Sequence, residues 1–185
     1  MESQAIKECE MKMKRTILAL EKELGKVRTG RASLALLDDI RVDYYGTPTP
    51  LNQAATLSVP ESRLIVIQPW DNSLLGEIEK AILKSELGMT PTNDGKVIRI
   101  TIPRLTEERR KELVKVVKKM GESSKVGVRN IRRDVIEELR TMEKGKDISE
   151  DELHHLQNQV QKTTDTFVEK IDEVIEAKEK EIMEI

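Results

Sequence analysis

The fold is decided by residues 107–142, which read EERRKELVKVVKKMGESSKVGVRNIRRDVIEELRTM. Apolar residues recur there at steps of three and four, the period of one face of an α-helix. Thr106 precedes two glutamates, which favours a capped helix start, and Gly145 is a plausible stop. Gly121 and Gly127 lie inside the stretch, where each costs up to about 1 kcal/mol relative to alanine. The apolar face carries Leu113, Val117, Met120, Ser124, Val128, Ile131, Val135, Leu139 and Met142.

Two further stretches have the same period and predict helices over residues 3–28 and 149–184. The second begins with Ser149 and Glu152, which have the spacing of a capping box. Only about six residues separate it from the helix before, so these two helices should be antiparallel neighbours. The two apolar faces carry Ile6, Cys9, Met13, Ile17, Leu20, Leu24 and Val27, and Leu153, Leu156, Val160, Thr163, Phe167, Ile171, Val174, Ala177 and Ile182.

The segment 31–105 differs from the rest, because all six prolines of the chain lie between residues 48 and 103. The segment Gly46–Pro50 is typical of a turn-rich connection, and an amphipathic helix is expected over 74–87, with Gly88 as its stop. Short β-type runs occupy residues 40–45, 63–68 and 97–102. The fold class is therefore α+β, with a small β/α/β domain inserted into an antiparallel three-helix bundle.

Domain boundaries follow from the insertion. Residues 1–29 and 106–185 are expected to form the bundle and residues 31–105 the inserted domain. Both ends of the insert must return to the bundle through short links, and such links predict a hinge at 29–31 and 103–106. Its residues are Thr29, Gly30, Pro103, Arg104, Leu105 and Thr106.

Composition excludes several classes of function. Cys9 is the single cysteine among 185 residues, so neither an intramolecular disulfide nor a cysteine-based metal site is expected. His154 and His155 are adjacent and diverge on a helix, so no metal site, catalytic triad or enzyme activity is predicted. No apolar run approaches the roughly 20 residues of a membrane span, and the first residues lack a signal peptide. A soluble, cytoplasmic protein is expected.

The stretch 106–140 has a net charge of +4, from eleven basic and seven acidic side chains, although the whole chain carries −2. Arg129 and Arg132 have no carboxylate three or four positions away, so their guanidinium groups are suited to phosphate. Two other interpretations stay open: a solvated face crossed by ion pairs, or a bond to an acid on a neighbouring helix. The basic face comprises Lys111, Lys115, Lys118, Lys119, Lys125, Arg129, Arg132, Arg133 and Arg140.

Four motifs in order resemble the bacterial ribosome recycling factor family. They are Val27–Ser33 (VRTGRAS), Tyr44–Leu51 (YYGTPTPL), Leu105–Lys111 (LTEERRK) and Val128–Asp134 (VRNIRRD). The resemblance implies an L-shaped, transfer-RNA-like molecule that acts with elongation factor G and GTP after termination. It implies that the pair splits the ribosome and frees messenger and transfer RNA, with GTP used by elongation factor G and no cofactor held by this chain.

The resemblance also implies partners and a site. The partners are the 70S ribosome and its 50S subunit, with contacts to 23S ribosomal RNA, and the chain is expected to be a monomer. The arginine of the family's motif corresponds to Arg132, with Arg129 beside it and Arg31 near the hinge. Together with the basic face, this gives the expected RNA-binding residues Arg132, Arg129, Arg133, Lys125, Lys118 and Arg31.

A different function class is also compatible with the pattern. A helical module that binds only protein would use the acidic third helix or the apolar faces for partner helices. Co-sedimentation with ribosomes at graded salt distinguishes the two, because phosphate contacts weaken as salt rises.

Overall fold

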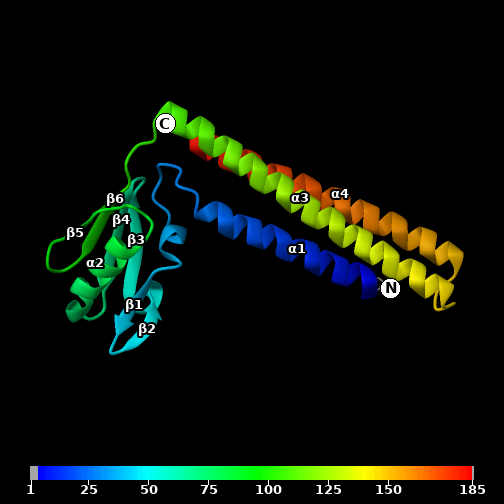
Figure 1. Cartoon of the computed structure of the whole chain (residues 1–185), viewed down its shortest axis with the longest axis horizontal. Coiled ribbons are helices and arrows are strands. Elements are labelled where there is room, and N and C mark those ends of the chain that lie inside the picture. The colour runs from blue at the N-terminus through cyan, green and yellow to red at the C-terminus, as the bar shows by residue number, and fades with distance from the viewer. Residues whose placement is uncertain (1–3, 185) are drawn as a thin grey trace. The chain divides into compact units, whose positions relative to one another are not determined.

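The computed structural model describes residues 4–184 (Figure 1). The chain divides into two compact units: Met1–Leu24 with Lys111–Ile185, and Gly25–Arg110. The first is a helical bundle and the second contains an antiparallel sheet, so the α+β class and the inserted sheet domain are confirmed. Both expected links, 29–31 and 103–106, fall within the second unit by this division. The hinge and the L shape stay predictions.

The bundle consists of three long helices: α1 (Gln4–Gly25), α3 (Glu107–Lys144) and α4 (Glu150–Met183). Figure 1 shows α1 and α4 alongside α3, each antiparallel to it. At about 1.5 Å per residue, α3 and α4 are roughly 50–57 Å long. Helix α1 ends earlier than the predicted 28, and residue 3 lies outside the described residues.

The buried faces of these helices largely match the expected ones. In α4 the prediction was wrong at Ala177, which is exposed, whereas Ile175 is buried. The buried face keeps a step of four from Ile171 to Ile175, as the helical period requires. The buried residues are Ile6, Cys9, Met13, Ile17, Leu20 and Leu24 in α1; Leu113, Val117, Gly121, Val128, Val135 and Leu139 in α3; and Leu153, Val160, Thr164, Phe167, Ile171, Ile175 and Ile182 in α4.

The turn between α3 and α4 is fixed by caps on both sides. The Ser149 hydroxyl accepts from the Glu152 backbone N–H at 3.2 Å, and the Glu152 carboxylate accepts from the Ser149 N–H at 2.9 Å, so the capping box is confirmed. Helix α3 ends at Lys144, so Gly145 as its stop is confirmed, and the left-handed conformation falls one residue later, at Lys146 (φ 62°). The Asp147 N–H bonds to the Met142 carbonyl at 2.9 Å, which completes a Schellman motif.

Gly121 allows α3 and α4 to approach closely. A Cβ atom placed on Gly121 would lie 2.7 Å from Cγ1 and 3.0 Å from Cδ1 of Ile175. A Cβ atom on Gly127 would lie 3.6 Å from Thr16, an ordinary van der Waals distance. The two glycines of α3 therefore differ: Gly121 is required by packing, whereas Gly127 is not.

The second unit is built on a four-stranded antiparallel sheet in the order β3-β4-β6-β5, with a separate β1–β2 hairpin. Ile65 and Ile67 of β4 pair with Ile100 and Ile98 of β6, and all four side chains are fully buried in one core with those of α2. The elements are β1 (Arg41–Tyr44), β2 (Thr47–Pro50), β3 (Ala55–Glu61), β4 (Leu64–Pro69), α2 (Leu75–Lys84), β5 (Pro91–Asn93) and β6 (Ile98–Thr101). Strands β1, β4 and β6 confirm the three predicted β-runs.

The prediction of a connection at Gly46–Pro50 was wrong, because residues 47–50 form strand β2. Tyr45 and Gly46 both have positive φ (49° and 81°), as a type I′ hairpin turn requires, and this turn aligns β2 with β1. The prolines are tolerated because β2 has one neighbouring strand and needs no donors on its open edge. Helix α2 also ends earlier than predicted, at Lys84, because Ser85 is already extended.

Candidate functional site

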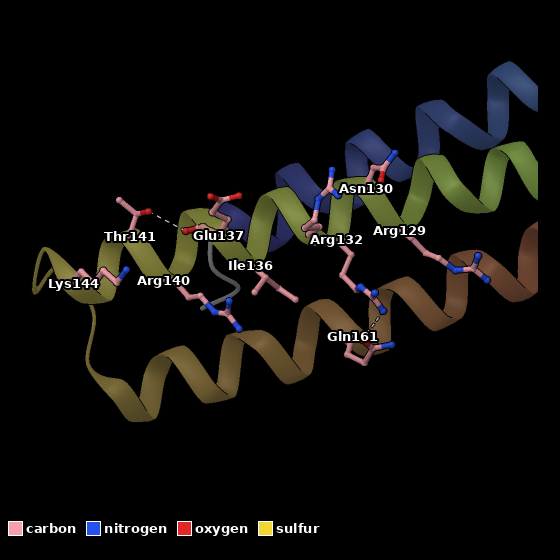
Figure 2. A pocket seen from close by; sticks show the side chains of 10 residues that line it. Arg129, Asn130, Arg132, Ile136, Glu137, Arg140, Thr141, Lys144 and Gln161 are labelled. Carbon is pink, nitrogen blue, oxygen red and sulfur yellow. Dashed lines mark hydrogen bonds between the residues drawn. The ribbon is translucent and has the colours of Figure 1, made fainter.

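Side chains of α3 line a pocket of about 880 Å³, which we call the arginine pocket. In Figure 2, Arg129, Arg132 and Arg140 extend from α3 toward α4. Apart from Ile136, its lining side chains are polar or charged, and Glu137 supplies the carboxylate among them. The lining residues are Arg129, Asn130, Arg132, Arg133, Ile136, Glu137, Arg140, Thr141 and Lys144 of α3, and Gln161 of α4.

Two arginines of the pocket bond no carboxylate within the described residues. Arg129 is exposed and has no hydrogen-bond or ion-pair partner among residues 4–184. The Nη1 atom of Arg132 donates to Oε1 of Gln161 at 3.1 Å, and this acceptor is neutral. Neither arginine therefore bonds an acid on a neighbouring helix. Both retain guanidinium donors that suit the planar, bidentate recognition of a phosphate.

Other cations of α3 are partly neutralised. Lys125 bonds Asp172 of α4 at 2.5 Å and Glu122 at 3.3 Å, and these bonds, chiefly that to Asp172, raise the pKa of its ammonium group. The Nζ atom of Lys118 lies 4.0 Å from Oε1 of Glu179 in α4. Lys125 is thus less available to an anion than the sequence suggested.

Of the two other expected residues, Arg133 lines the arginine pocket and Arg31 does not. Arg133 lies 3.9 Å from its neighbour Asp134 but stays 73% exposed, and it lines the arginine pocket. Among the described residues, neither Arg133 nor Arg140 forms an ion pair with Glu137. Arg31 is exposed and belongs to the other compact unit.

Seven of the ten pocket residues were not in the expected set, and three of these bear on anion binding: Arg140, Lys144 and Gln161. Arg140 could have been found, because it lies on the basic face of the helix. Gln161 gave no local signal, since it comes from a different helix and contacts Arg132 across 29 positions of sequence. The structure therefore extends the candidate site toward the end of α3 and onto α4.

The cysteine and the two histidines, residue types that often take part in catalysis, lie in the bundle core and on its surface, respectively. Cys9 is fully buried in the bundle, and burial raises the pKa of its thiol. His154 and His155 are both exposed on α4. Within the described part of the chain, His, Cys, Asp and Glu form no group of three that could hold a metal ion. None of its helices is both long and apolar enough to cross a bilayer.

Fold and pocket together define a class: an α+β protein with a helical bundle, an inserted sheet unit and a cationic surface suited to a polyanion. A family model described as ribosome recycling factor matches residues 20–183. Relatives with that same name match between 94% and 100% of the chain. The chain belongs to the ribosome recycling factor family.

Individual relatives support this placement. A ribosome-recycling factor of Syntrophus aciditrophicus (strain SB) is 62% identical over 185 residues, which cover 100% of both chains. One of Desulfatibacillum aliphaticivorans is 61% identical over 177 residues, 96% of each chain. A solution structure of a ribosome recycling factor is 45% identical, covers 100% of both chains and has a TM-score of 0.79.

One solved complex is also similar. It holds models of the T. thermophilus ribosome recycling factor and E. coli elongation factor G bound to the E. coli post-termination complex. The matching chain is 44% identical, with 98% of both chains covered and a TM-score of 0.67.

Proposed function

We propose that this chain acts with elongation factor G and GTP on the post-termination ribosome, splits its subunits and releases messenger and transfer RNA. Family membership over nearly the whole chain supports the proposal. So does the similar chain found with elongation factor G on a post-termination complex. In this proposal elongation factor G uses the GTP, and this chain works as a cytoplasmic monomer without a cofactor.

The single observation that carries the RNA-binding part is the charge of the arginine pocket. Arg129 and Arg132 bond no carboxylate within the described residues, so phosphates of 23S ribosomal RNA in the 50S subunit can serve as their counter-ions. The lining has no aromatic side chain on which a base could stack. Recognition would therefore follow RNA backbone shape rather than base identity.

Subunit splitting tests the proposal directly. Light scattering of post-termination ribosomes should fall only when this chain, elongation factor G and GTP are all present. Arg132→Ala should weaken 50S binding by about 1.5–3 kcal/mol, the typical worth of a charge-assisted contact, while the melting temperature stays near that of the wild type. Arg15→Ala is the matched control, because Arg15 is exposed on α1 and lies outside the pocket. Equal losses in both variants would contradict a specific site.

One observation supports the alternative function, a helical module that binds only protein. A second pocket, with a partly apolar lining, is formed by α1 and α3: Thr16, Ala19, Leu20, Glu23, Val116, Lys119, Met120, Ser123 and Ser124. A partner helix could occupy it. Binding to ribosomes that does not change between low and high salt would favour this alternative, because RNA contacts release counterions.

The hinge belongs to the same proposal. Gly30 has φ +78°, and a Cβ atom there would lie 3.4 Å from Cγ of Leu105, so the two links are adjacent. We expect the units to reorient about these links on the microsecond-to-millisecond scale. A disulfide between cysteines introduced in the two links, on a Cys9→Ser background, should preserve 50S binding and abolish splitting. Full splitting by the oxidised variant would exclude the hinge.

A further inference from the structure

Gln161 lies between a cation and an anion, and this fixes which way its amide points. Its Oε1 atom accepts from Nη1 of Arg132 at 3.1 Å, and its Nε2 atom donates to Oδ1 of Asp165 at 2.8 Å. Turning the amide over would place its NH₂ group against the guanidinium and its oxygen against the carboxylate. Both contacts would become repulsive, so the charges on either side hold the carbonyl oxygen toward Arg132.

From this arrangement we propose that Gln161 is a positioning residue that holds Arg132 ready for a phosphate of ribosomal RNA. The inference rests on the proposed function and adds a residue from α4 to a site otherwise formed by α3. Figure 2 shows Arg132 reaching across to Gln161 from α3. Arg129 has no such hydrogen bond among the described residues.

A neutral acceptor suits this role better than a carboxylate. An arginine has five N–H donors, and the bond to Gln161 uses a donor on Nη1, so other donors stay free for an anion. The amide leaves the positive charge of Arg132 intact, whereas a glutamate would neutralise it and compete with the phosphate. Asp165 makes its contact with the amide rather than with the guanidinium.

Positioning has an energetic consequence. An arginine side chain loses rotamer freedom when it is immobilised at an interface, and this loss weakens binding. The bond to Gln161 restricts Arg132 before the RNA arrives, so less freedom remains to be lost. The contribution of Gln161 should therefore appear in affinity, not in the number of phosphates contacted.

The test measures binding to isolated 50S subunits by co-sedimentation over a series of potassium chloride concentrations. Gln161→Ala should bind about three- to tenfold more weakly than wild type, with an unchanged slope of log affinity against log salt. Gln161→Glu should bind more than about tenfold more weakly at low salt. Its slope should be shallower by about 0.7–0.9, the loss of one phosphate contact. Asn158→Ala, an exposed position on the same helix, is the control and should match wild type.

A double variant separates positioning from an independent or purely structural role. Arg132→Ala with Gln161→Ala should bind no more weakly than Arg132→Ala alone, because Gln161 acts through that arginine. Wild-type affinity for Gln161→Ala, or an undiminished effect of Gln161→Ala when Arg132 is absent, would overturn the inference. Loss of binding that merely follows a lower melting temperature would overturn it too. If Arg132→Ala itself bound like wild type at every salt concentration, the proposed RNA-binding surface would fail, and the inference with it.

Discussion

Replacing Gly121 with alanine should destabilise the bundle, although alanine is the better helix former. The new Cβ atom would lie 2.7 Å from Cγ1 of Ile175, where ordinary contacts begin at 3.4 Å. Ile175 cannot easily move away, because it is 8% exposed and a β-branched side chain in a helix is largely confined to one rotamer. The helices would have to separate or the side chain would have to strain.

The magnitude follows from two opposing terms. Alanine gains about 1 kcal/mol over glycine in a helix interior. Overpacking a well-filled site costs about 1–3 kcal/mol, and the short distance at Gly121 favours the upper half of that range. We expect Gly121→Ala to lower the free energy of unfolding by about 1–2 kcal/mol. Gly127→Ala should raise it by up to about 1 kcal/mol, because its Cβ atom would make only an ordinary contact.

Urea denaturation followed by far-ultraviolet circular dichroism measures both values. Ile175→Ala alone should cost about 2–5 kcal/mol. It should cost clearly less in the Gly121→Ala background, since removing the isoleucine also removes the overlap. Stabilisation by Gly121→Ala equal to that by Gly127→Ala would refute the close approach of α3 and α4.

Three further predictions concern other parts of the chain. Lys146→Gly should raise the free energy of unfolding by about 0.5–1 kcal/mol, because Lys146 has φ 62°, a conformation that glycine adopts at lower cost. Urea denaturation measures this gain, and its absence would argue against a strained turn. Asp94 accepts hydrogen bonds from the Val97 N–H, Arg99 and the Lys96 N–H, which hold the pKa of its carboxyl well below the usual range. Its stabilising effect is present above about pH 4 and is lost as pH falls further, so acid titration of Asp94→Asn should show a shallower loss of stability than wild type. The Cys9 thiol, fully buried and with its pKa raised by burial, should react with iodoacetamide only when the bundle opens, and fast alkylation of the native protein would contradict this packing.

Helices were predictable because their signal is local. The steps of three and four between residues such as Leu113 and Val117 are written within a few turns, and Ser149 with Glu152 marks a start within four residues. Strand pairing is not local. Strand β5 spans three residues, and its place at the sheet edge depends on β6 rather than on its own composition. No periodicity can be read from so short a strand.

The candidate site shows the same limit. The missing local acids around Arg129 and Arg132 indicated that neither is paired with a carboxylate, and within the described residues neither bonds one. Spacing along α3 did not predict the contact between Lys125 and Asp172, or that between Arg132 and Gln161, because these partners lie on α4. Contacts across a helix pair depend on register and rotation, which one helix alone does not specify.

The discontinuous bundle has a consequence for the order of events during synthesis. Helix α1 is made first, yet its helical partners α3 and α4 follow only after the whole sheet unit. About 120 residues separate the end of α1 from the end of α3, which at about 5–20 residues per second is roughly 6–24 s. During that interval the apolar face of α1, from Ile6 to Leu24, lacks a complete α3 or α4 to cover it. A nascent chain of this protein therefore presents chaperones with an amphipathic helix, while its sheet unit can already be folded.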